Sequence, residues 1–258
     1  MLDQLLGIER YTPWQEETHL PLRFDAHHPQ GICEAEGASW LSTVDMEGTV
    51  GHLIGFDATG EELTRLELVD GDRFHPGGLD ATRAGVLVAL AEYRPHSSTS
   101  VLVADLAAGT CSTLFEHPDH LGAIVAVDEE RIFAVTWGSR ELLLLDWDGR
   151  VVDSRPNPTH VIDFQDVQLV APNAVACTGT STLVFGDRLE PMGGMGVVDL
   201  DGLHLVHEAP ITVRSDLPDR ALTYNAVRFR SEGERLVLEA VADDGPGARL
   251  LRYSAAVG

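Results

Sequence analysis

The stretch FHPGGLD, residues 74–80, places a histidine and a proline before two glycines. Related segments flank it, with HHPQGI upstream and DHLGAI downstream. The histidine of this pattern recurs after 47 residues, from His28 to His75, and after 45 residues, from His75 to His120. A fixed period between about 20 and 50 residues is typical of repeat architectures.

Two apolar segments follow each of these histidine segments, and the second usually ends in an acidic residue and a glycine turn. The first apolar segment occurs five times, at residues 37–44, 85–93, 131–138, 174–180 and 235–241. The second occurs at residues 51–60, 100–109, 141–149 and 194–202, and a fifth copy without the turn lies at 248–254. The aspartates that precede these glycines are interpreted as turn residues: Asp57, Asp105, Asp146 and Asp199.

Many of these segments are continuous apolar runs, which indicates strands covered by protein on both faces. Together with the repeat, this predicts an all-β fold in one domain, residues 1–258, a β-propeller of five four-stranded blades. A spare N-terminal strand at 18–25 is expected to pair with 248–254 and close the ring. A two-sheet sandwich is the alternative, but sandwiches do not repeat every ~45 residues. The predicted blades are 28–70, 75–117, 120–157, 163–215 and 223–254.

Composition restricts the classes of partner. The chain has 18 Lys and Arg against 41 Asp and Glu, a formal charge of −23, which would repel nucleic acid and anionic membranes. The N-terminus lacks the basic segment of a signal peptide, and no apolar run approaches the length of a membrane span. Three widely spaced cysteines suggest buried thiols in a reducing cytoplasm. We expect a cytoplasmic protein that is a monomer or a weak homodimer.

One face of the propeller carries the chemically interesting residues. In this fold, the loop that leads into the first strand of a blade lies on the same face as the loop between its second and third strands. The leading segments contribute a ring of His28, His75, His120, Gln165 and Tyr224, with Asp166 and Asn225 beside it. The other loops contribute Glu92, Tyr93, Arg94, His96, Trp137 and Arg140.

These residue types suggest roles. Arg94 and Arg140 are expected to bind an anionic group, although each could instead pair with a structural acid such as Glu92 or Asp166. The proposed catalytic residues for acid and base chemistry are His75, His120, Glu92 and Tyr93. The proposed substrate-binding residues are Arg94, Arg140, His96, Trp137, Gln165, Asp166, Tyr224 and Asn225. Proline and glycine beside a histidine also fit plain turn chemistry.

The segments HPGGLD, AEYRPHSS, HLGAIV, TWGSR and FQDVQ together resemble a family of small bacterial and fungal β-propeller proteins of unassigned role. The resemblance implies the fold but no reaction. The design is more distantly similar to gluconolactonase and strictosidine-synthase-like propellers. Their calcium ligands, a Glu with Asn and Asp residues, are not matched here, so calcium-dependent lactonase activity is not expected.

The sequence therefore suggests a small-molecule enzyme that acts on an anionic organic substrate by proton transfer, as a lyase, an isomerase or cyclase, or a hydrolase. A non-catalytic binding or sensing propeller and a protein-interaction scaffold are the alternatives. Either no cofactor is needed, or His28, His75 and His120 hold one divalent transition metal, namely zinc, iron or copper. No G-x-S-x-G, phosphate loop or dinucleotide fingerprint occurs, so no nucleotide cofactor is expected.

Overall fold

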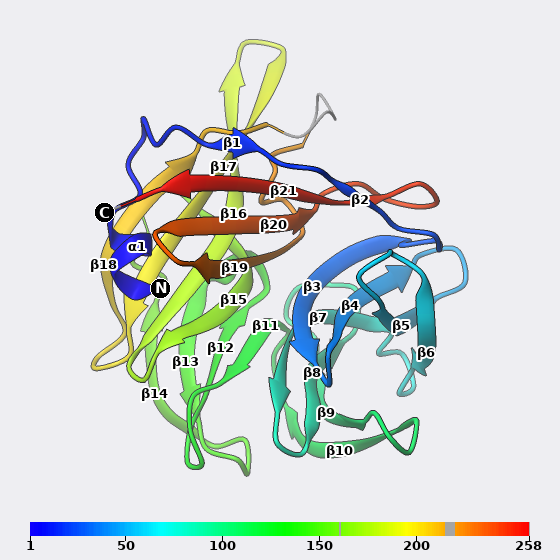
Figure 1. Ribbon diagram of the computed structural model, residues 1–258. Helices are drawn as coiled ribbons and strands as arrows, with labels where there is room; N and C mark the ends of the chain where they lie inside the picture. Colours follow the sequence, from blue (N-terminus) through cyan, green and yellow to red (C-terminus); the bar gives the residue numbers. More distant parts are fainter. Residues whose placement is uncertain (160, 215–219, 258) are drawn as a thin grey trace.

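Five antiparallel sheets surround a common axis in the computed structural model, which describes residues 1–159, 161–214 and 220–257 (Figure 1). Each sheet is one blade, and its strands run outward from the axis in chain order. The five-bladed β-propeller predicted from the sequence is thus confirmed. Residue 215, where the sequence places the end of blade four, lies outside the described residues.

The strands of the five blades have the following bounds. Blade one consists of β3 (His28–Ala35), β4 (Ala38–Asp45), β5 (Val50–Phe56) and β6 (Glu62–Leu68). Blade two consists of β7 (His75–Thr82), β8 (Gly85–Ala91), β9 (Thr99–Asp105) and β10 (Thr110–His117). Blade three consists of β11 (Leu121–Ala126), β12 (Ile132–Thr136), β13 (Glu141–Leu145) and β14 (Val151–Pro156). The last two consist of β15 (Asp163–Ala171), β16 (Ala174–Phe185), β17 (Arg188–Asp199) and β18 (His204–Ile211), and of β19 (Ala226–Glu232), β20 (Arg235–Val241) and β21 (Arg249–Ala256).

The N-terminal segment closes the ring. Strand β21 pairs with β20 on one side and with two short strands, β1 (Gln15–Glu16) and β2 (Leu20–Pro21), on the other (Figure 1). The single strand expected at 18–25 is therefore two short pieces that begin earlier, and beyond them the N–H of Leu22 donates to the carbonyl oxygen of Ala248. This pairing of β1 and β2 with β21, called the clasp below, covers an edge that would otherwise be open to pairing with another chain.

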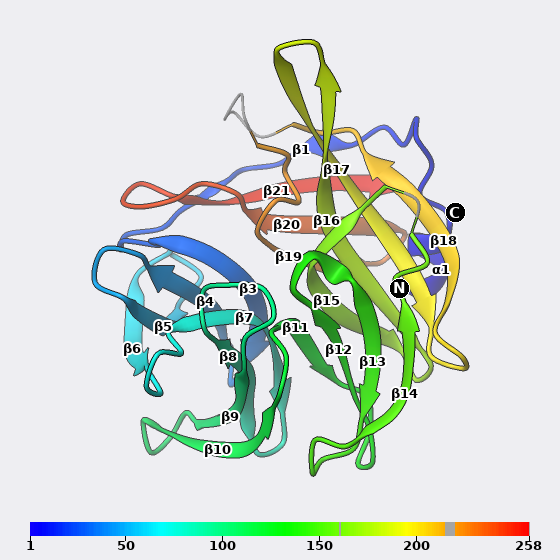
Figure 2. The same cartoon turned by 180° about the vertical axis from the view of Figure 1, so that it is seen from behind.

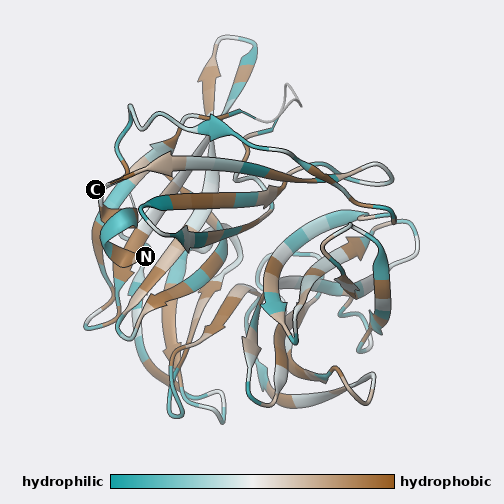
Figure 3. Cartoon of the chain, viewed as in Figure 1, coloured by the Kyte–Doolittle hydropathy of each residue, from teal (hydrophilic) through white to brown (hydrophobic). Residues whose placement is uncertain are grey.

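Hydrophobic side chains fill the spaces between neighbouring blades. Five buried clusters lie between successive pairs of blades, the last joining blade five to blade one. Strand β8 shows how this works, because Val86 and Val88 pack toward blade one while Leu87 and Ala89 pack toward blade three. Figure 3 accordingly shows mainly hydrophobic residues on many of the middle strands and hydrophilic residues at many turns. Continuous apolar runs are thus the signature of strands with two buried faces.

The glycine pair of HPGG lies where two inner strands meet closely. A Cβ atom on Gly77 would lie 2.1 Å from the carbonyl oxygen of Gly122, and one on Gly78 would lie 2.7 Å from the Cβ of Ala123. Both distances are far inside van der Waals contact, so a larger residue would force β7 and β11 apart. The recurring glycines therefore set the spacing of the blades around the axis.

A long hairpin extends blade four. The segments 181–185 of β16 and 188–192 of β17 pair with each other beyond the ends of β15 and β18, and they project from the body of the molecule (Figure 2). The apolar segments expected here, 174–180 and 194–202, stop short of this hairpin, so the extension of both strands was not predicted. Residues 182–185, Thr-Leu-Val-Phe, favour a strand, and the two-residue turn at Gly186 and Asp187 completes a hairpin, with Gly186 at a φ of 62°.

The N-terminal helix α1 (Leu2–Leu6) packs against blade five, where Leu5 and Ile8 join the cluster that contains Leu236. In the described part of the chain, no helix is long and apolar enough to cross a membrane.

The three cysteines are not equivalent. Cys33 and Cys177 are buried thiols, as expected, but Cys111 is exposed on the outer strand β10, so the expectation of burial is wrong for it. An outer strand has one face toward solvent, which the sequence segment does not reveal.

Candidate functional site

A cavity of about 240 Å³ opens at the end of the axis where the inner strands begin. Its wall contains the whole ring of leading residues expected from the sequence: His28, His75, His120, Gln165 and Tyr224. Tyr93 and Trp137 join them from the connections between second and third strands, and Thr180 joins them from strand β16. The two sets of loops therefore share one face and one cavity.

His75, His120, Tyr93 and Trp137 pack together on one side of this cavity. The ring centroids of His75 and His120 are 5.2 Å apart, and the ring of Trp137 stands edge-on to that of His120 at 4.4 Å. Tyr93 packs edge-on against His75, also at 4.4 Å. Trp137 opens a short 3-10 turn, η1 (Trp137–Ser139), in which Gly138 adopts a φ of 66°. The aromatic side chains thereby hold both imidazoles in place.

Hydrogen bonding fixes the tautomer of His120. Its Nδ1 lies 3.1 Å from the carbonyl oxygen of Arg94, which can only accept a hydrogen bond, and 3.3 Å from the hydroxyl of Ser97, which donates to the carbonyl oxygen of Glu92. Nδ1 therefore carries the proton of the neutral ring. Nε2 is then the unprotonated nitrogen. It is buried and has no hydrogen-bond partner among the described residues, and the same holds for Nδ1 of His75. His120 thus has an imidazole nitrogen with a lone pair that no described group uses, in a side chain with none of its surface exposed to solvent.

Burial keeps both rings neutral. It lowers the pKa of His120 from 6.5 to about 4, and it lowers the pKa of His75 well below the ordinary value, with a further contribution from the neighbouring His120. Near pH 7 the pair can therefore accept a proton but cannot act as a fixed cation.

Asp163 forms another part of the wall. Its Oδ1 accepts a hydrogen bond of 3.0 Å from the hydroxyl of Ser139, and Ser139 in turn accepts one from the backbone N–H of Phe164. Burial raises the pKa of Asp163 above its ordinary value, against the opposing effect of its hydrogen bonds to Ser139 and Gln165. The carboxyl group therefore retains a proton more readily than an exposed aspartate does.

His28 is turned toward a carboxylate at the edge of the cavity. Its Nδ1 lies 3.1 Å from Oδ1 of Asp244, which also forms an ion pair of 2.6 Å with Arg220 and accepts a hydrogen bond from Asn225. Although burial opposes it, hydrogen bonding to His28 and Arg220 lowers the pKa of Asp244 to about 2. These contacts fix the positions of His28 and Asn225, both of which line the cavity.

The expected anion-binding arginines do not line the cavity. Arg140 forms two hydrogen bonds, of 2.8 and 3.0 Å, with the carboxylate of Asp119, and Arg94 forms an ion pair of 2.8 Å with Glu92. Each arginine thus pairs with an acidic residue, which was the alternative to anion binding. Arg94 pairs with the suggested Glu92, and Arg140 pairs with Asp119 instead of Asp166. His96 is exposed on the same loop as Arg94, at a φ of 52°. Neither Glu92 nor His96 is among the residues that line the cavity.

Asp166 lies deeper along the axis and is fully buried. Its Oδ2 accepts hydrogen bonds from the backbone N–H groups of Ile32 and Val227, at 3.3 and 3.1 Å, which belong to blades one and five. It therefore joins three blades at the centre of the ring. This placement makes Asp166 a structural residue and not part of the cavity wall, contrary to its expected role in substrate binding.

The three histidines expected to hold a metal line one cavity but do not form a compact set. In the described part of the chain, one group of three has ligand atoms that all lie within 4.8 Å of one another, and it consists of His27, Asp45 and His52. His28, His75 and His120 do not meet this condition because His28 faces Asp244. The axial metal therefore stays an expectation without a ready ligand set.

A search of curated proteins returns no match. A family model described as a family of unknown function, DUF6454, matches residues 2–258. The chain belongs to the DUF6454 family. This agrees with the resemblance to propellers of unassigned role, and family membership brings no reaction with it.

Solved structures resemble this DUF6454 chain in fold, at low identity. A hypothetical protein from Leishmania major has a TM-score of 0.57 at 11% identity, covering 93% of this chain and 90% of that one. An α-L-arabinanase from Penicillium chrysogenum, complexed with arabinobiose, has a TM-score of 0.55 at 10% identity and coverages of 93% and 99%. An α-L-arabinofuranosidase from Fusarium graminearum has a TM-score of 0.54 at 8% identity, with coverages of 94% and 98%. These similarities establish the fold alone.

Sequence reasoning missed two features of this face of the DUF6454 chain. Asp163 stands one residue before the segment FQDVQ, which was used to align blade four, and the alignment did not reach it. His27 precedes the aligned His28, and its neighbours Asp45 and His52 come from another part of blade one. The doubled histidine of HHPQG was the available signal for the second feature.

Proposed function

We propose that the axial cavity binds a compact polar organic molecule and carries out proton transfer on it, with His120 as the base. The observation that supports this proposal is the tautomer of His120, in which Nδ1 donates to the Arg94 carbonyl and leaves Nε2 unpaired in the buried wall. A buried acceptor without a protein partner carries a desolvation penalty that a ligand hydroxyl or acidic C–H could relieve.

Asp163 would serve as the complementary acid. Burial raises the pKa of Asp163, which favours a role as proton donor over that of an exposed aspartate, while neutral His120 can receive a proton. A base and an acid on one cavity wall are what an isomerase, a lyase or a hydrolase needs.

The wall favours a neutral substrate over the anionic one expected from the sequence. Among the described residues that line the cavity there is no arginine, and the wall instead offers amides and imidazoles beside four aromatic rings: Tyr93, Trp137, Phe164 and Tyr224. Aromatic faces combined with neutral hydrogen-bonding groups suit a hydroxyl-rich molecule such as a small sugar. The volume, about 240 Å³, is below the roughly 300 Å³ at which drug-sized pockets begin.

Two propellers of similar fold bear the names arabinanase and arabinofuranosidase, which makes pentoses sensible first probes. Glycoside hydrolysis generally uses two carboxylates that flank the bond, and in the described lining Asp163 is the one carboxylate. Proton abstraction next to a carbonyl group is therefore the better supported reaction, and an isomerase or lyase the better supported class.

Deuterium exchange tests this directly. The purified protein is incubated in D₂O with arabinose, xylose, ribose and their lactones, and NMR spectroscopy follows deuterium incorporation next to the carbonyl carbon. We expect exchange with at least one probe, and a loss of about 10²- to 10⁴-fold in His120→Gln, the usual contribution of a general base. The exposed His96→Gln serves as the matched control and should retain full exchange.

Calorimetry with the same probes separates the alternatives. Millimolar or tighter binding without any exchange would favour a sensing module that uses the same cavity without turnover. No binding to any of these probes, or binding unchanged in both His120→Gln and His75→Gln, would remove the cavity from consideration as the site for this class of molecule.

A further inference from the structure

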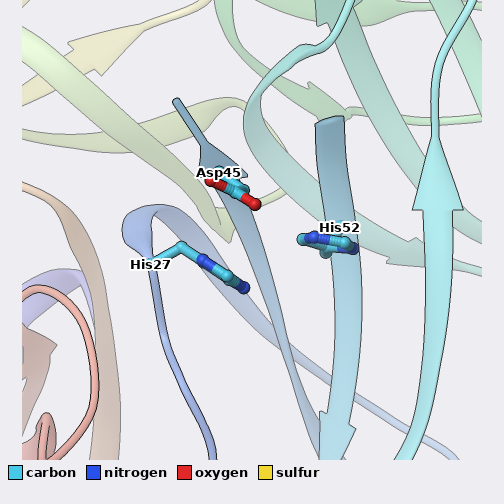
Figure 4. Close-up of side chains that lie close together, drawn as sticks. All are labelled: His27, Asp45 and His52. Carbon is cyan, nitrogen blue, oxygen red and sulfur yellow. The ribbon is translucent and has the colours of Figure 1, made fainter. Parts of the chain in front are cut away.

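Blade one carries a second group of ligating side chains, on the same face as the cavity but separate from its wall. His27 precedes β3, Asp45 ends β4, and His52 lies on β5, and these three lie close together in Figure 4. One ligand atom of each lies within 4.8 Å of those of the other two. We propose that His27, Asp45 and His52 bind a divalent transition-metal ion.

The two imidazoles are already arranged side by side. Their ring centroids are 5.0 Å apart and the ring planes differ by 24°. His27 adopts a φ of 48°, in the left-handed region that a non-glycine residue seldom occupies, which fixes the direction from which its ring approaches His52. The two stacked rings already lie close together, so little reorganisation is needed to present two nitrogens to one ion.

His52 supplies an independent sign of a missing partner. Its side chain is buried, with 6% of its surface exposed, and its Nδ1 has no hydrogen-bond partner in the described part of the chain. Buried polar atoms are paired in the great majority of cases, so an unpaired imidazole nitrogen beside a carboxylate requires an explanation. A metal ion would satisfy it.

The carboxylate is also held in place. Oδ1 of Asp45 accepts hydrogen bonds from the backbone N–H groups of Glu47 and Gly48, each at 3.0 Å, which fixes the orientation of the side chain at the turn between β4 and β5. Two imidazole nitrogens and one carboxylate oxygen suit zinc or another divalent transition metal, and oxygen-preferring calcium or magnesium much less.

The surrounding charges favour a cation despite one arginine. Arg65 donates to Nε2 of His27 at 3.2 Å, which competes with an ion for that nitrogen. Arg65 also pairs with Glu62 on its own strand, so it has another partner if displaced. Oδ1 of Asp25 lies 3.8 Å from Nδ1 of His27. On the neighbouring strand β6, Glu67 is the residue paired with His52. Around the two histidines, one arginine is thus outnumbered by four acidic residues: Asp25, Asp45, Glu62 and Glu67.

Zinc titration of the chelator-treated, full-length protein by isothermal calorimetry tests this site. We expect one ion to bind in the micromolar range or tighter. Asp45→Asn keeps the carbonyl oxygen that accepts the turn hydrogen bonds but loses the charge, and it should weaken binding at least about tenfold, as should His52→Gln. Removing the competing donor in Arg65→Gln should instead strengthen binding by about tenfold, because it also removes a nearby positive charge.

His75→Gln is the matched control, since it changes a buried histidine of the axial cavity and should leave zinc binding unchanged. Zinc binding that survives Asp45→Asn and His52→Gln but is lost in His75→Gln would place the ion at the axis and overturn the proposal. No binding at micromolar zinc would overturn it as well. If His52→Gln does not fold, as judged by circular dichroism, Asp45→Asn and Arg65→Gln decide, because their opposite effects are expected from this site alone.

Discussion

Asp163 and Asp166 lie three residues apart on β15, yet one lines the mouth of the axial cavity and the other is sealed deeper along the axis. Asp163 is held by the hydroxyl of Ser139 and faces the space in which a ligand would sit. Asp166 accepts backbone N–H groups from two other blades. The same residue type thus lines the ligand cavity at its mouth and links three blades deeper along the axis.

A β-bulge lies between the two aspartates. Phe164 pairs with Gly179 and Asp166 with Thr178, so Gln165 is an extra residue on β15. Asp163 and Gln165 line the cavity, and Asp166 follows the bulge and is buried on the axis. In both places burial raises the pKa of the aspartate, which shows that a perturbed pKa does not by itself identify a functional residue.

The largest loss of folding stability should come from replacing Asp166, the aspartate deeper along the axis. Asp166→Ala deprives the N–H groups of Ile32 and Val227 of their acceptor, and each buried unpaired donor costs about 1 to 3 kcal/mol, so we expect unfolding to become easier by roughly 2 to 6 kcal/mol. Urea denaturation at pH 7 measures it. Asp163→Ala is the control and should cost much less. Equal losses in the two variants would contradict the distinction between the two aspartates.

Lowering the pH should change the contributions of His120 and Asp80 to folding stability in opposite directions. The folded-state pKa of His120 is about 4 against an ordinary 6.5, so below pH 6.5 the unfolded chain takes up a proton that the folded chain refuses. Stability is therefore lost as pH falls from 6.5 to 4, by about 3 kcal/mol in total at 1.36 kcal/mol per pH unit. On the inner strand β7, Asp80 has a pKa raised from 3.8 to about 6 by burial, so its contribution is lost as pH rises through that window.

Single substitutions should separate these opposing contributions. In His120→Gln the proton uptake by this histidine on unfolding is removed, so the loss of stability from pH 6.5 to pH 4.5 should be smaller than in the wild type. In Asp80→Asn the histidine term remains, and acid should destabilise more steeply than in the wild type. Urea midpoints at the two pH values give the comparison, and parallel pH profiles in all three proteins would refute the assignment.

The smallest effect should be that of Asp163→Asn on stability. The amide keeps an oxygen that can accept the Ser139 hydroxyl, so the free energy of unfolding should stay within about 1 kcal/mol of the wild type. The same variant should lower deuterium exchange into a bound probe by about tenfold or more, because a neutral amide cannot deliver a proton. A stability loss close to that of Asp166→Ala would instead make Asp163 a second structural tie.

Periodicity in the sequence was enough to predict the fold. The spacing of His28, His75 and His120 marks where inner strands begin, and continuous apolar runs such as 86–90 mark strands with two buried faces. The ring of cavity residues followed because the topology of a propeller assigns each loop to a face. These features depend on repeated patterns, which a single sequence displays.

Side-chain partners could not be predicted in the same way. Arg140 pairs with Asp119 on a neighbouring loop, and Asp163 instead of Asp166 lines the cavity. Neither placement follows from spacing alone. The cluster of His27, Asp45 and His52 brings together a loop and two strands of one blade. Such contacts depend on local backbone geometry and rotamers, for which composition and period give no signal.

The clasp of blade five has a consequence for synthesis on the ribosome. Residues 15–21 are made before their partner β21, residues 249–256, which follows more than 200 residues later. Blades one to four can assemble as they emerge, while the first strands wait without a partner and blade five stays open. The ring can therefore close only after translation has reached β21, and a ribosome that stalls before that point displays an incomplete propeller with two exposed edges.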